Sequence, residues 1–469
     1  MPTLLHRVRM SLLELLKGFI VISPINDPAT GAAVYAADRE HVFHSWSAQA
    51  QITPIPVAGA AGSYFWDYSG KKYLDFSCQL VFTNIGHQHP KVVKAIQEQA
   101  AILTTIAPQH ANVARNEAAK RIVDLAGAPF KKVFFTNAGA DAVENAIRMA
   151  RQHTQRDKIL STYRSYHGNT GAAINSTGDP RRFPNEFSIG HVHFWGPYLY
   201  RSAFWATDEA QECQRAIEHL EQTIIFEGPK TIAALLLESI PGTAGILVPP
   251  AGYLDGVRAL CDKYGILWIA DEVMAGFGRA GKWFAFEHSN SVPDLIVFAK
   301  GITSGYVPLG GVIISDEIAK TFDDRVFPGG LTYSGHPLAC ATAVATIDVM
   351  KEEKIVENAA MIGEKILGPG LHELAKKHQV IGDIRGVGVF WGMDIVTNRE
   401  SRSPIAPYGS SSPEMNELIN ACKKNGLMPF PNFNRLHMTP PCNISEADAR
   451  LGLELLDKSL AEIGKHYQA

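Results

Sequence analysis

Short apolar runs alternate with longer amphipathic stretches through the middle of the chain. The apolar runs are rich in Val, Ile, Leu and Phe, and they predict six strands at residues 131–136, 158–163, 231–239, 266–271, 295–300 and 310–315. The stretches before and between them, such as 89–103 and 140–153, carry apolar residues at helical spacing. Near-continuous apolar strands separated by helices are typical of a mostly parallel sheet with helices on both faces. The pattern therefore predicts an α/β fold.

Both ends of the chain show a different pattern. Residues 62–76 alternate aromatic and small residues around Ser69-Gly70, a turn signal, and this predicts a hairpin. Near the other end, residues 382–396 predict a pair of strands, and residues 446–467 predict a closing helix. The two ends therefore supply strands outside the main alternating region.

These patterns predict two folded units and one extension. Residues 90–335 are expected to form a large α/β domain, and residues 26–89 with 336–469 a smaller α+β domain built from both ends. A long helical stretch near 338–375 is expected to connect them. The chain has 469 residues, which is enough for two packed cores. Residues 1–25 remain as an N-terminal extension.

The first 22 residues are apolar but carry the charged side chains of Arg7, Arg9, Glu14 and Lys17. A signal peptide needs an uninterrupted apolar stretch and a cleavage site with small residues, and Glu14 and Lys17 interrupt this one. A membrane span needs about 20 mainly apolar residues, and the same charges argue against it. We expect a helix-forming extension that packs on a surface or on a partner subunit, with a targeting role as the alternative.

Composition narrows the class of protein. Hydrophobic residues make up 46% and charged residues 19% of the chain, which is typical of a soluble globular protein. The formal net charge is −3, so no basic excess points to nucleic acid. Six dispersed cysteines form no Cys-x-x-Cys pair and no zinc-ligand spacing. We therefore expect a reduced, cytoplasmic small-molecule enzyme that needs no metal, membrane or nucleic acid.

The most informative pair of residues is Asp271 and Lys300. Asp271 ends one predicted strand, and Lys300 ends another 29 residues later (300 − 271). Ligands bind at the carboxyl ends of the strands in open parallel sheets. Pyridoxal 5′-phosphate (PLP) needs a lysine for its Schiff base and a carboxylate to keep its pyridine nitrogen protonated, so the pair suits this cofactor. Taken singly, Asp271 also suits a helix N-cap and Lys300 a surface position.

Three further segments suit the same cofactor when taken together. An apolar strand runs into the turn 136–140 and then a helix, whose free backbone N–H groups form an anion site near Gly139. Tyr166 and His167 follow another strand, where an aromatic ring can stack on a flat cofactor. Thr332 offers a hydroxyl to a phosphate. Each segment also has an ordinary explanation: a strand–helix turn, an aromatic in a loop core and a capping threonine.

The order of these segments resembles the class III pyridoxal-phosphate aminotransferases, the omega-aminotransferase branch of fold type I. The resemblance covers roughly residues 28–460 and includes ADEVMAGFGRAGKWFAFE (270–287) and PDLIVFAKGITSGYVPLGGV (293–312). It implies a large domain with a mainly parallel seven-stranded sheet and a smaller α+β domain. It also implies a homodimer, with a tetramer as the alternative, whose active sites lie at the subunit interface.

The resemblance implies a role for each matching residue. Lys300 matches the Schiff-base lysine that also shuttles protons, and Asp271 matches the partner of the pyridine nitrogen. The other implied cofactor contacts are Gly139 and Ala140 at the phosphate, Val273 and Tyr166 on the two ring faces, His167 in the stacking loop, Glu238 near Asp271, and Thr332 from the partner subunit.

Two segments depart from the family pattern. The phosphate turn reads Ala138-Gly139-Ala140-Asp141 where the family commonly has Ser-Gly-Ser/Thr-Glu, so side-chain hydroxyl groups are lost at this turn. We expect cofactor binding to survive, weaker by about 1 kcal/mol for the lost hydrogen bond. Thr243 stands where the ornithine and 4-aminobutyrate branches carry a glutamate, which argues against those substrates.

Three residues are predicted to contact the substrate. Arg435 is the candidate anchor for an acidic group, because a planar guanidinium suits a carboxylate or a sulfonate; a surface arginine is the alternative. Val81 stands where several pyruvate-dependent omega-aminotransferases carry tryptophan, which points to a differently shaped small pocket. Trp46, together with Phe82, is expected at the entrance, with core packing as the alternative.

The predicted reaction is a ping-pong amino transfer. The donor is an omega-amino acid or sulfonate such as β-alanine or taurine, or a related primary amine, and the acceptor is pyruvate or 2-oxoglutarate. This donor class follows from the resemblance and from Thr243. The alternatives are another PLP enzyme on the same scaffold, namely an aminomutase, racemase or decarboxylase, and a non-catalytic protein that binds PLP.

Overall fold

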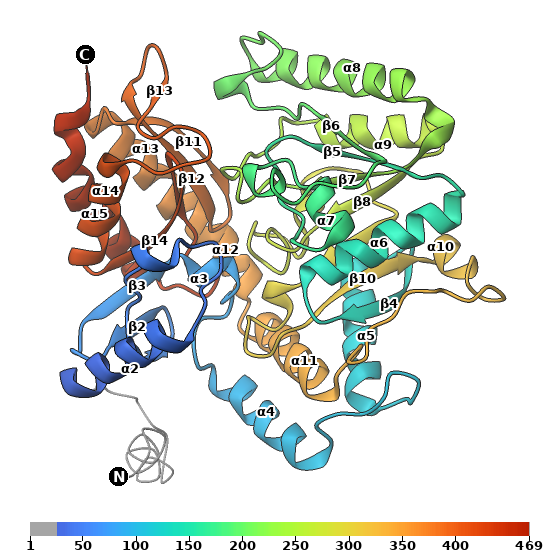
Figure 1. The fold of residues 1–469 in the computed structure, drawn as a ribbon, viewed down its shortest axis with the longest axis horizontal. Coiled ribbons are helices and arrows are strands. Elements are labelled where there is room, and N and C mark those ends of the chain that lie inside the picture. Colours follow the sequence, from blue (N-terminus) through green and yellow to red (C-terminus); the bar gives the residue numbers. More distant parts are fainter. Residues whose placement is uncertain (1–25, 469) are drawn as a thin grey trace.

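Two β-sheets and their helices make up residues 26–468, the part of the chain that the computed structural model describes (Figure 1). The elements from the middle of the chain, cyan through green to yellow in the figure, surround one sheet. Those from the two ends, blue and red, surround the other. The helix expected over the first 22 residues lies outside the described residues.

The first sheet has seven strands in the order β4-β10-β9-β8-β7-β5-β6. Their bounds are β4 Phe130–Thr136, β5 Lys158–Thr162, β6 His191–Phe194, β7 Ile232–Glu238, β8 Leu267–Asp271, β9 Leu295–Phe298 and β10 Gly310–Ser315. Strand β10 runs antiparallel to both β4 and β9, and the strands from β9 to β6 run parallel. The mainly parallel seven-stranded sheet is thus confirmed. Apolar runs did not predict β6, because His191–Phe194 alternates histidine with apolar residues.

Helices cover both faces of this sheet because its central strands are apolar on both sides. Within β8, Ile269 packs with residues of helix α6 (Gly139–Thr154), whereas Trp268 packs in the core that includes helix α9 (Tyr253–Tyr264). Successive side chains of a strand point to opposite faces, so these two contacts mark the two covered faces. The other helices around this sheet are α5 Val113–Ala126, α7 Gly171–Ser176, α8 Glu209–Glu227 and α10 Asp316–Lys320.

The second sheet joins strands from both ends of the chain. Its order is β1-β2-β3-β14-β15-β12-β11, with β13 beside β12. The bounds are β1 Val57–Ala61, β2 Tyr64–Asp67, β3 Lys72–Phe76, β11 Ile381–Val387, β12 Phe390–Asn398, β13 Ser403–Pro404, β14 Leu427–Asn432 and β15 Arg435–Met438. The hairpin predicted at 62–76 corresponds to β2–β3, and the pair predicted at 382–396 corresponds to β11–β12. A parallel contact between β3 and β14 joins the two halves.

The helical stretch expected near 338–375 is a run of consecutive helices. It comprises α11 Pro337–Glu352, α12 Ile355–Ile362, a π-helix Gly363–Leu367 and α13 Gly368–Lys377. The remaining α-helices are α2 Pro28–His41, α3 Cys78–Val81, α4 Pro90–Ile102, α14 Pro413–Lys424 and α15 Glu446–Ile463. Between residues 26 and 468, none of the helices is long and apolar enough to cross a membrane. The limits proposed for the two domains stay predictions.

Candidate active site

The carboxyl ends of the parallel strands border a cavity of about 480 Å³. Segments that follow β4, β5, β7, β8 and β9 contribute to its wall, which is the usual ligand position in an open α/β sheet. The sequence-predicted residues that line it are Trp46, Gly139, Ala140, Tyr166, His167, Glu238, Asp271, Val273 and Lys300. Val81, Thr332 and Arg435 are not among the described residues of its wall.

Lys300 lies just beyond the strand that was expected to end with it. Strand β9 ends at Phe298, and Lys300 begins a short 3₁₀ turn, Lys300–Ile302. Its φ of 47° lies in the left-handed region, which residues other than glycine rarely adopt unless the surrounding structure holds them there. Tight packing also requires Gly301, because a Cβ at that position would lie 2.4 Å from Asn84 Nδ2. The turn therefore holds Lys300 on the cavity wall.

Burial changes the acidity of the Lys300 amine. A low-dielectric surrounding disfavours the ammonium form and lowers the pKa of Lys300 from its ordinary 10.5 to about 8. The negative charges of Asp271 and Glu238 oppose this shift. A substantial fraction of the amine is therefore neutral near pH 8, and the neutral form is the nucleophile that attacks a carbonyl carbon.

Asp271 ends β8 and is 3% exposed. Its Oδ2 lies 2.7 Å from His167 Nδ1, and its Oδ1 accepts a hydrogen bond from the backbone N–H of Val273 at 3.1 Å. The other ring nitrogen of His167, Nε2, is buried without a hydrogen-bond partner among the described residues. The two contacts fix the orientation of the Asp271 carboxylate at the cavity wall.

Glu238 lies opposite Asp271 in the register of β7 and β8. It accepts hydrogen bonds from the backbone N–H of Tyr166 at 2.9 Å and of Gly242 at 2.8 Å. Burial, together with the nearby charge of Asp271, raises the pKa of Glu238 from 4.5 to about 7. Glu238 therefore ties the Tyr166 loop to the sheet edge and is partly protonated near pH 7.

Sequence reasoning missed Glu272, the residue after Asp271. It is fully buried and accepts hydrogen bonds from Ser239 Oγ at 2.5 Å and from the backbone N–H groups of Ala285 and Phe286 at 2.8 and 2.9 Å. Burial raises the pKa of Glu272 from 4.5 to about 7. These contacts fasten the segment after Asp271 behind the cavity wall. The available sequence signal was an acidic residue directly after a buried strand.

The turn between β4 and α6 forms another part of the wall. Helix α6 begins at Gly139, and its N-cap residue Ala138 provides no side-chain cap for the first backbone N–H groups. A Cβ on Gly139 would lie 2.9 Å from Val273 Cγ1. A Cβ on Gly168, whose φ is +136°, would lie 2.6 Å from Ala140 Cβ. The helix N-terminus, the β8 loop and the loop after β5 therefore approach one another closely.

The other predicted residues lie at different depths. Trp46 is 62% exposed and lines the cavity together with Phe82. Val81 is buried and packs with Met274, behind the wall to which Phe82 and Met274 contribute. Thr332 is exposed, and a contact of its hydroxyl with the phosphate site of a partner subunit stays a prediction.

The structure places Arg181, rather than the predicted Arg435, beside the cavity. Arg435 is buried, and its guanidinium donates to the backbone carbonyl of Ala244. The guanidinium carbon of Arg181 instead lies 3.6 Å from the ring centre of Tyr166 and 5.9 Å from that of Trp46. Both rings belong to the cavity wall, so Arg181 is the arginine next to the predicted substrate position.

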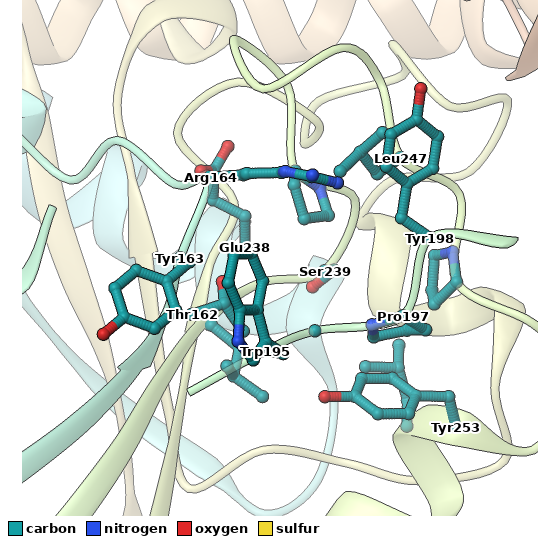
Figure 2. A pocket seen from close by; sticks show the side chains of 15 residues that line it. Thr162, Tyr163, Arg164, Trp195, Pro197, Tyr198, Glu238, Ser239, Leu247 and Tyr253 are labelled. Atoms are coloured by element: carbon teal, nitrogen blue, oxygen red, sulfur yellow. The ribbon is translucent and has the colours of Figure 1, made fainter. Parts of the chain in front are cut away.

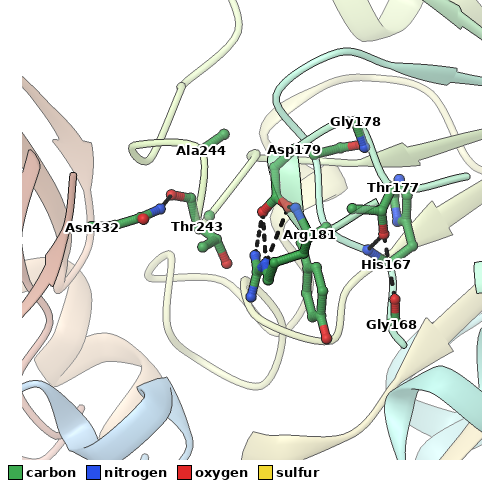
Figure 3. A network of polar contacts seen from close by, with 12 residues as sticks. His167, Gly168, Thr177, Gly178, Asp179, Arg181, Thr243, Ala244 and Asn432 are labelled. Carbon is green, nitrogen blue, oxygen red and sulfur yellow. Dashed lines mark hydrogen bonds and ion pairs between the residues drawn. The ribbon is translucent and has the colours of Figure 1, made fainter. Parts of the chain in front are cut away.

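Asp179 holds Arg181 in this position (Figure 3). Arg181 Nε donates to Asp179 Oδ2 at 2.9 Å, and the backbone N–H of Arg181 donates to Asp179 Oδ1 at 2.9 Å. The sequence signal for this residue was weak, because Asp179-Pro180-Arg181 has the form of an ordinary helical-turn start.

The chemistry of these groups fits pyridoxal phosphate. One cavity combines a buried amine, a carboxylate oriented by two contacts, an aromatic ring and an uncapped helix N-terminus. Within residues 26–468, no group of three or more His, Cys, Asp or Glu side chains is placed to hold a metal ion.

The comparisons with known proteins agree with one another. The family description "Aminotransferase class-III" matches residues 46–460. The chain is 31% identical over 458 residues to the taurine–pyruvate aminotransferase of Bilophila wadsworthia, covering 93% of this chain and 98% of that protein. It is 34% identical over 423 residues to the putrescine–pyruvate aminotransferase of Pseudomonas aeruginosa, covering 87% and 91%.

The fold also matches a solved structure. Taurine:2-oxoglutarate aminotransferase from Bifidobacterium kashiwanohense, in complex with PLP and glutamate, is 43% identical and superposes with a TM-score of 0.90, covering 93% of this chain and 98% of that one. Together with the family match over most of the length, this shows that the chain belongs to the class-III aminotransferase family.

Proposed function

We propose that this protein is a PLP-dependent omega-aminotransferase. It moves an amino group from an omega-amino acid, an omega-amino sulfonate or a related primary amine to pyruvate or 2-oxoglutarate. The observation that carries the proposal is the buried, partly neutral amine of Lys300 on the same cavity wall as the carboxylate of Asp271. The relatives support the substrate range, since their names include taurine and putrescine as donors and pyruvate and 2-oxoglutarate as acceptors.

The cavity residues would hold PLP from several sides. Lys300 Nζ would bind its aldehyde carbon, Asp271 would pair with its pyridine nitrogen, and the first N–H groups of α6 would bind its phosphate. Val273 and Tyr166 would pack on its two ring faces. When bound, the cofactor supplies an electron sink for the bond that breaks at the donor carbon.

Lys300 is the proposed general base and acid. Because burial holds the pKa of Lys300 near 8, its Nζ can take up the proton from the donor carbon and give it up again within one turnover. Asp271 is held by His167 and by the backbone N–H of Val273, so its charge needs no reorientation during the reaction. Glu238 keeps the Tyr166 loop in place through the Tyr166 N–H.

Arg181 is the proposed anchor for the acidic group of the donor. A planar guanidinium binds a carboxylate or a sulfonate through paired hydrogen bonds, and the contact with Tyr166 keeps this one beside the cavity. Arg435 instead supports the wall, because it holds the Ala244 carbonyl next to Thr243, a wall residue. This assignment replaces Arg435 as the candidate anchor.

The assembly and compartment are also proposals. We infer a homodimer, with a tetramer as the alternative, in which Thr332 of each subunit contacts the phosphate site of the other. A cytoplasmic location is supported by the six cysteines, all of which are free. Sedimentation velocity of the holoenzyme tests the assembly: a species with the mass of one chain at micromolar concentration contradicts it.

Replacement of the lysine gives the most direct test. Lys300→Ala is expected to lose the visible absorption of lysine-bound PLP and to lower kcat by at least about 10³-fold, because both the covalent attachment and the proton transfer disappear. Lys263→Ala is the matched control, because Lys263 is exposed and pairs with Glu221 outside the cavity. Retention of the visible absorption in Lys300→Ala would overturn the site assignment.

A panel of donors separates transamination from the other PLP reactions. β-Alanine, taurine, putrescine and a neutral primary amine are each incubated with the holoenzyme, with and without pyruvate or 2-oxoglutarate. Sustained turnover that requires the 2-oxo acid supports an aminotransferase. Turnover without any 2-oxo acid identifies an aminomutase, racemase or decarboxylase, and the absence of any half-reaction identifies a non-catalytic PLP-binding protein.

A further inference from the structure

A second cavity, of about 400 Å³, lies beside the segment that follows β5. It shares no described wall residue with the Lys300 cavity. Among residues 26–468, its wall contains four arginines and one carboxylate, that of Asp394. The arginines are Arg164, Arg182, Arg201 and Arg435. We propose that this cavity is a second anion-binding site that takes a small dicarboxylate.

Asp394, the carboxylate of this wall, already has an ion-pair partner and hydrogen-bond donors. Asp394 Oδ2 lies 2.7 Å from a terminal nitrogen of Arg385 and accepts a hydrogen bond from Tyr198 Oη at 2.9 Å. Its Oδ1 accepts a hydrogen bond from Asn434 Nδ2 at 2.9 Å. The Arg385 charge lowers the pKa of Asp394 to about 2, so the carboxylate stays ionised but is occupied by these partners.

Arg164 is a wall arginine that forms no ion pair within the described residues, although the charge of Asp394 acts on it from a distance. Its contacts within the described residues are aromatic: the guanidinium carbon lies 5.0 Å from the ring centre of Tyr198 and 5.6 Å from that of Trp195. Burial lowers the pKa of Arg164 below its ordinary value. The surrounding groups therefore do not fully offset the cost of burying its positive charge. A partly buried guanidinium without a carboxylate gains most from a bound anion.

The backbone conformation holds Arg164 in this place. Its φ of 61° lies in the left-handed region, which is uncommon for arginine and marks a residue that the surrounding structure constrains. Figure 2 shows the Arg164 side chain extending past Glu238 toward Tyr198 and Leu247. The conformation that brings Arg164 to the wall of the second cavity therefore carries a backbone cost without any ion pair in return.

Two more wall arginines have donors that are incompletely used. Arg201 Nε lies 3.6 Å from Asp394 Oδ1, which is longer than a hydrogen bond. Arg182 pairs with Glu186 at 3.3 Å through Nε, and one of its terminal nitrogens lies 2.8 Å from His193 Nδ1. Because several guanidiniums share one cavity, an anion with two carboxylates fits the charge better than one with a single carboxylate.

The walls between the arginines suit a short carbon chain. Tyr163, Trp195, Tyr198 and Tyr408 line the same cavity, so the methylene groups of the ligand meet aromatic surface while its ends meet guanidiniums. The volume of about 400 Å³ lies within the ordinary range for small-molecule sites. A dicarboxylate of four or five carbons has the matching chemistry.

Succinate is the probe, because it has neither an amino nor a keto group and cannot react at Lys300. Its binding to the holoenzyme is measured by isothermal titration calorimetry in Tris buffer at low ionic strength, where charge pairing is least screened. Arg164→Met is expected to weaken binding at least about tenfold, the effect of one lost charge-assisted hydrogen bond. Arg164→Lys keeps the charge and is expected to weaken it less. Arg450→Met, an exposed arginine paired with Glu446, is the control and leaves it unchanged.

Two results would overturn the site. One is wild-type succinate affinity in Arg164→Met with the fold intact by circular dichroism. The other is loss of binding in Arg181→Gln but not in Arg164→Met, which places the anion in the Lys300 cavity. If Arg164→Met does not fold, Arg201→Met replaces it, and unchanged affinity there contradicts the proposal. The KM for the amino donor in Arg164→Met is expected to stay within about twofold of wild type, because Arg164 is not on the Lys300 cavity wall.

Discussion

The two cavities beside the carboxyl ends of the seven-stranded sheet differ in the balance of positive and negative side chains on their walls. In the Lys300 cavity, one amine faces the carboxyl groups of Asp271 and Glu238, which belong to neighbouring strands. In the second cavity, four arginines share the wall with the single carboxylate of Asp394. The first cavity therefore contains its own acid and base, whereas the second has cations to spare.

This difference shows how one sheet edge supports two kinds of chemistry. In the Lys300 cavity, burial outweighs the attraction between opposite charges and moves the pKa values toward neutrality: it lowers the pKa of Lys300 to about 8 and raises the pKa of Glu238 to about 7. Such groups exchange protons near physiological pH. Where guanidiniums gather, no proton can be exchanged, because arginine stays protonated, and the same burial favours binding of an anion.

After replacement of Lys300 itself, Asp271→Asn is expected to cause the largest loss of activity. It removes the negative charge from the Lys300 cavity and should lower kcat about 10²–10³-fold, since a preorganised charge is lost. It should also lower the pKa of Lys300 further, because Asp271 opposes the effect of burial on that amine.

Two measurements on Asp271→Asn check this expectation. Steady-state kinetics give kcat, and the pH dependence of PLP capture by the cofactor-free protein reports the neutral amine. Capture should rise with pH toward a plateau above about pH 8 in the wild type and at lower pH in the variant. Asp316→Asn, which affects an exposed pair with Lys320, is the control. A kcat within tenfold of wild type would count against the role of Asp271.

Arg181→Gln tests whether Arg181, rather than Arg435, binds the acidic group of the donor. Loss of a charge-assisted pair should lower kcat/KM for β-alanine or taurine about 10–100-fold, mostly through KM, while a neutral primary amine is little affected. Arg435→Gln, measured with the same donors, separates anchoring from wall support. An equal loss for acidic and neutral donors in Arg181→Gln would show that the residue only maintains structure.

Glu272→Gln is expected to have the smallest effect, a change in how the free energy of unfolding depends on pH. The sign of this change follows from the linkage between proton binding and folding. Burial raises the pKa of Glu272 from 4.5 to about 7, so the folded protein binds more protons than the unfolded chain in this window. The free energy of unfolding contributed by Glu272 is therefore greatest below pH 4.5 and is lost as pH rises through 7. The amide of Gln cannot titrate. The decline of the unfolding free energy between pH 4.5 and 7 should therefore become shallower in the variant, by the slope that corresponds to up to about one bound proton.

Urea unfolding of the cofactor-free protein at several pH values measures this slope. Gln has a single amide oxygen, whereas Phe286 and Ala285 donate to different oxygens of Glu272, Oε1 and Oε2, so one of these backbone N–H groups loses its acceptor in the variant. This loss lowers the free energy of unfolding at every pH, and the slope against pH is the quantity that reports the proton. Glu446→Gln, at an exposed site, serves as the control. An identical slope in Glu272→Gln and wild type would mean that Glu272 does not take up its proton in this window.

Local pattern was sufficient for most of the sheet and for placing Asp271 and Lys300 on one cavity wall. Six of the seven strands were predicted from apolar runs, because a strand buried on both faces must be apolar along its length. Asp271 and Lys300 are predicted as site residues for the same reason, since polar residues at the ends of such runs face the ligand edge, and both line the cavity. Strand β6 was missed because it alternates histidine with apolar residues.

The arginines could not be assigned by pattern. Arg435 was favoured for its place in the sequence, yet its guanidinium is used by the Ala244 carbonyl. Arg181 reaches Tyr166 only because Asp179 and the loop after α7 bring it there. Arg164 looks like one more loop residue until its φ and its aromatic neighbours are known.

The sequence by itself determined the fold class, the ligand edge and the lysine–carboxylate pair, because each depends on short-range hydrophobic pattern and on the chemistry of single residues. Only the tertiary structure decided which charges meet. Pairing of Glu238 with the Tyr166 loop and of Arg181 with Tyr166 joins residues that are remote in sequence or separated by irregular loops. Charge balance and burial are set by those contacts, and they in turn set the acidity and the binding preference of each cavity.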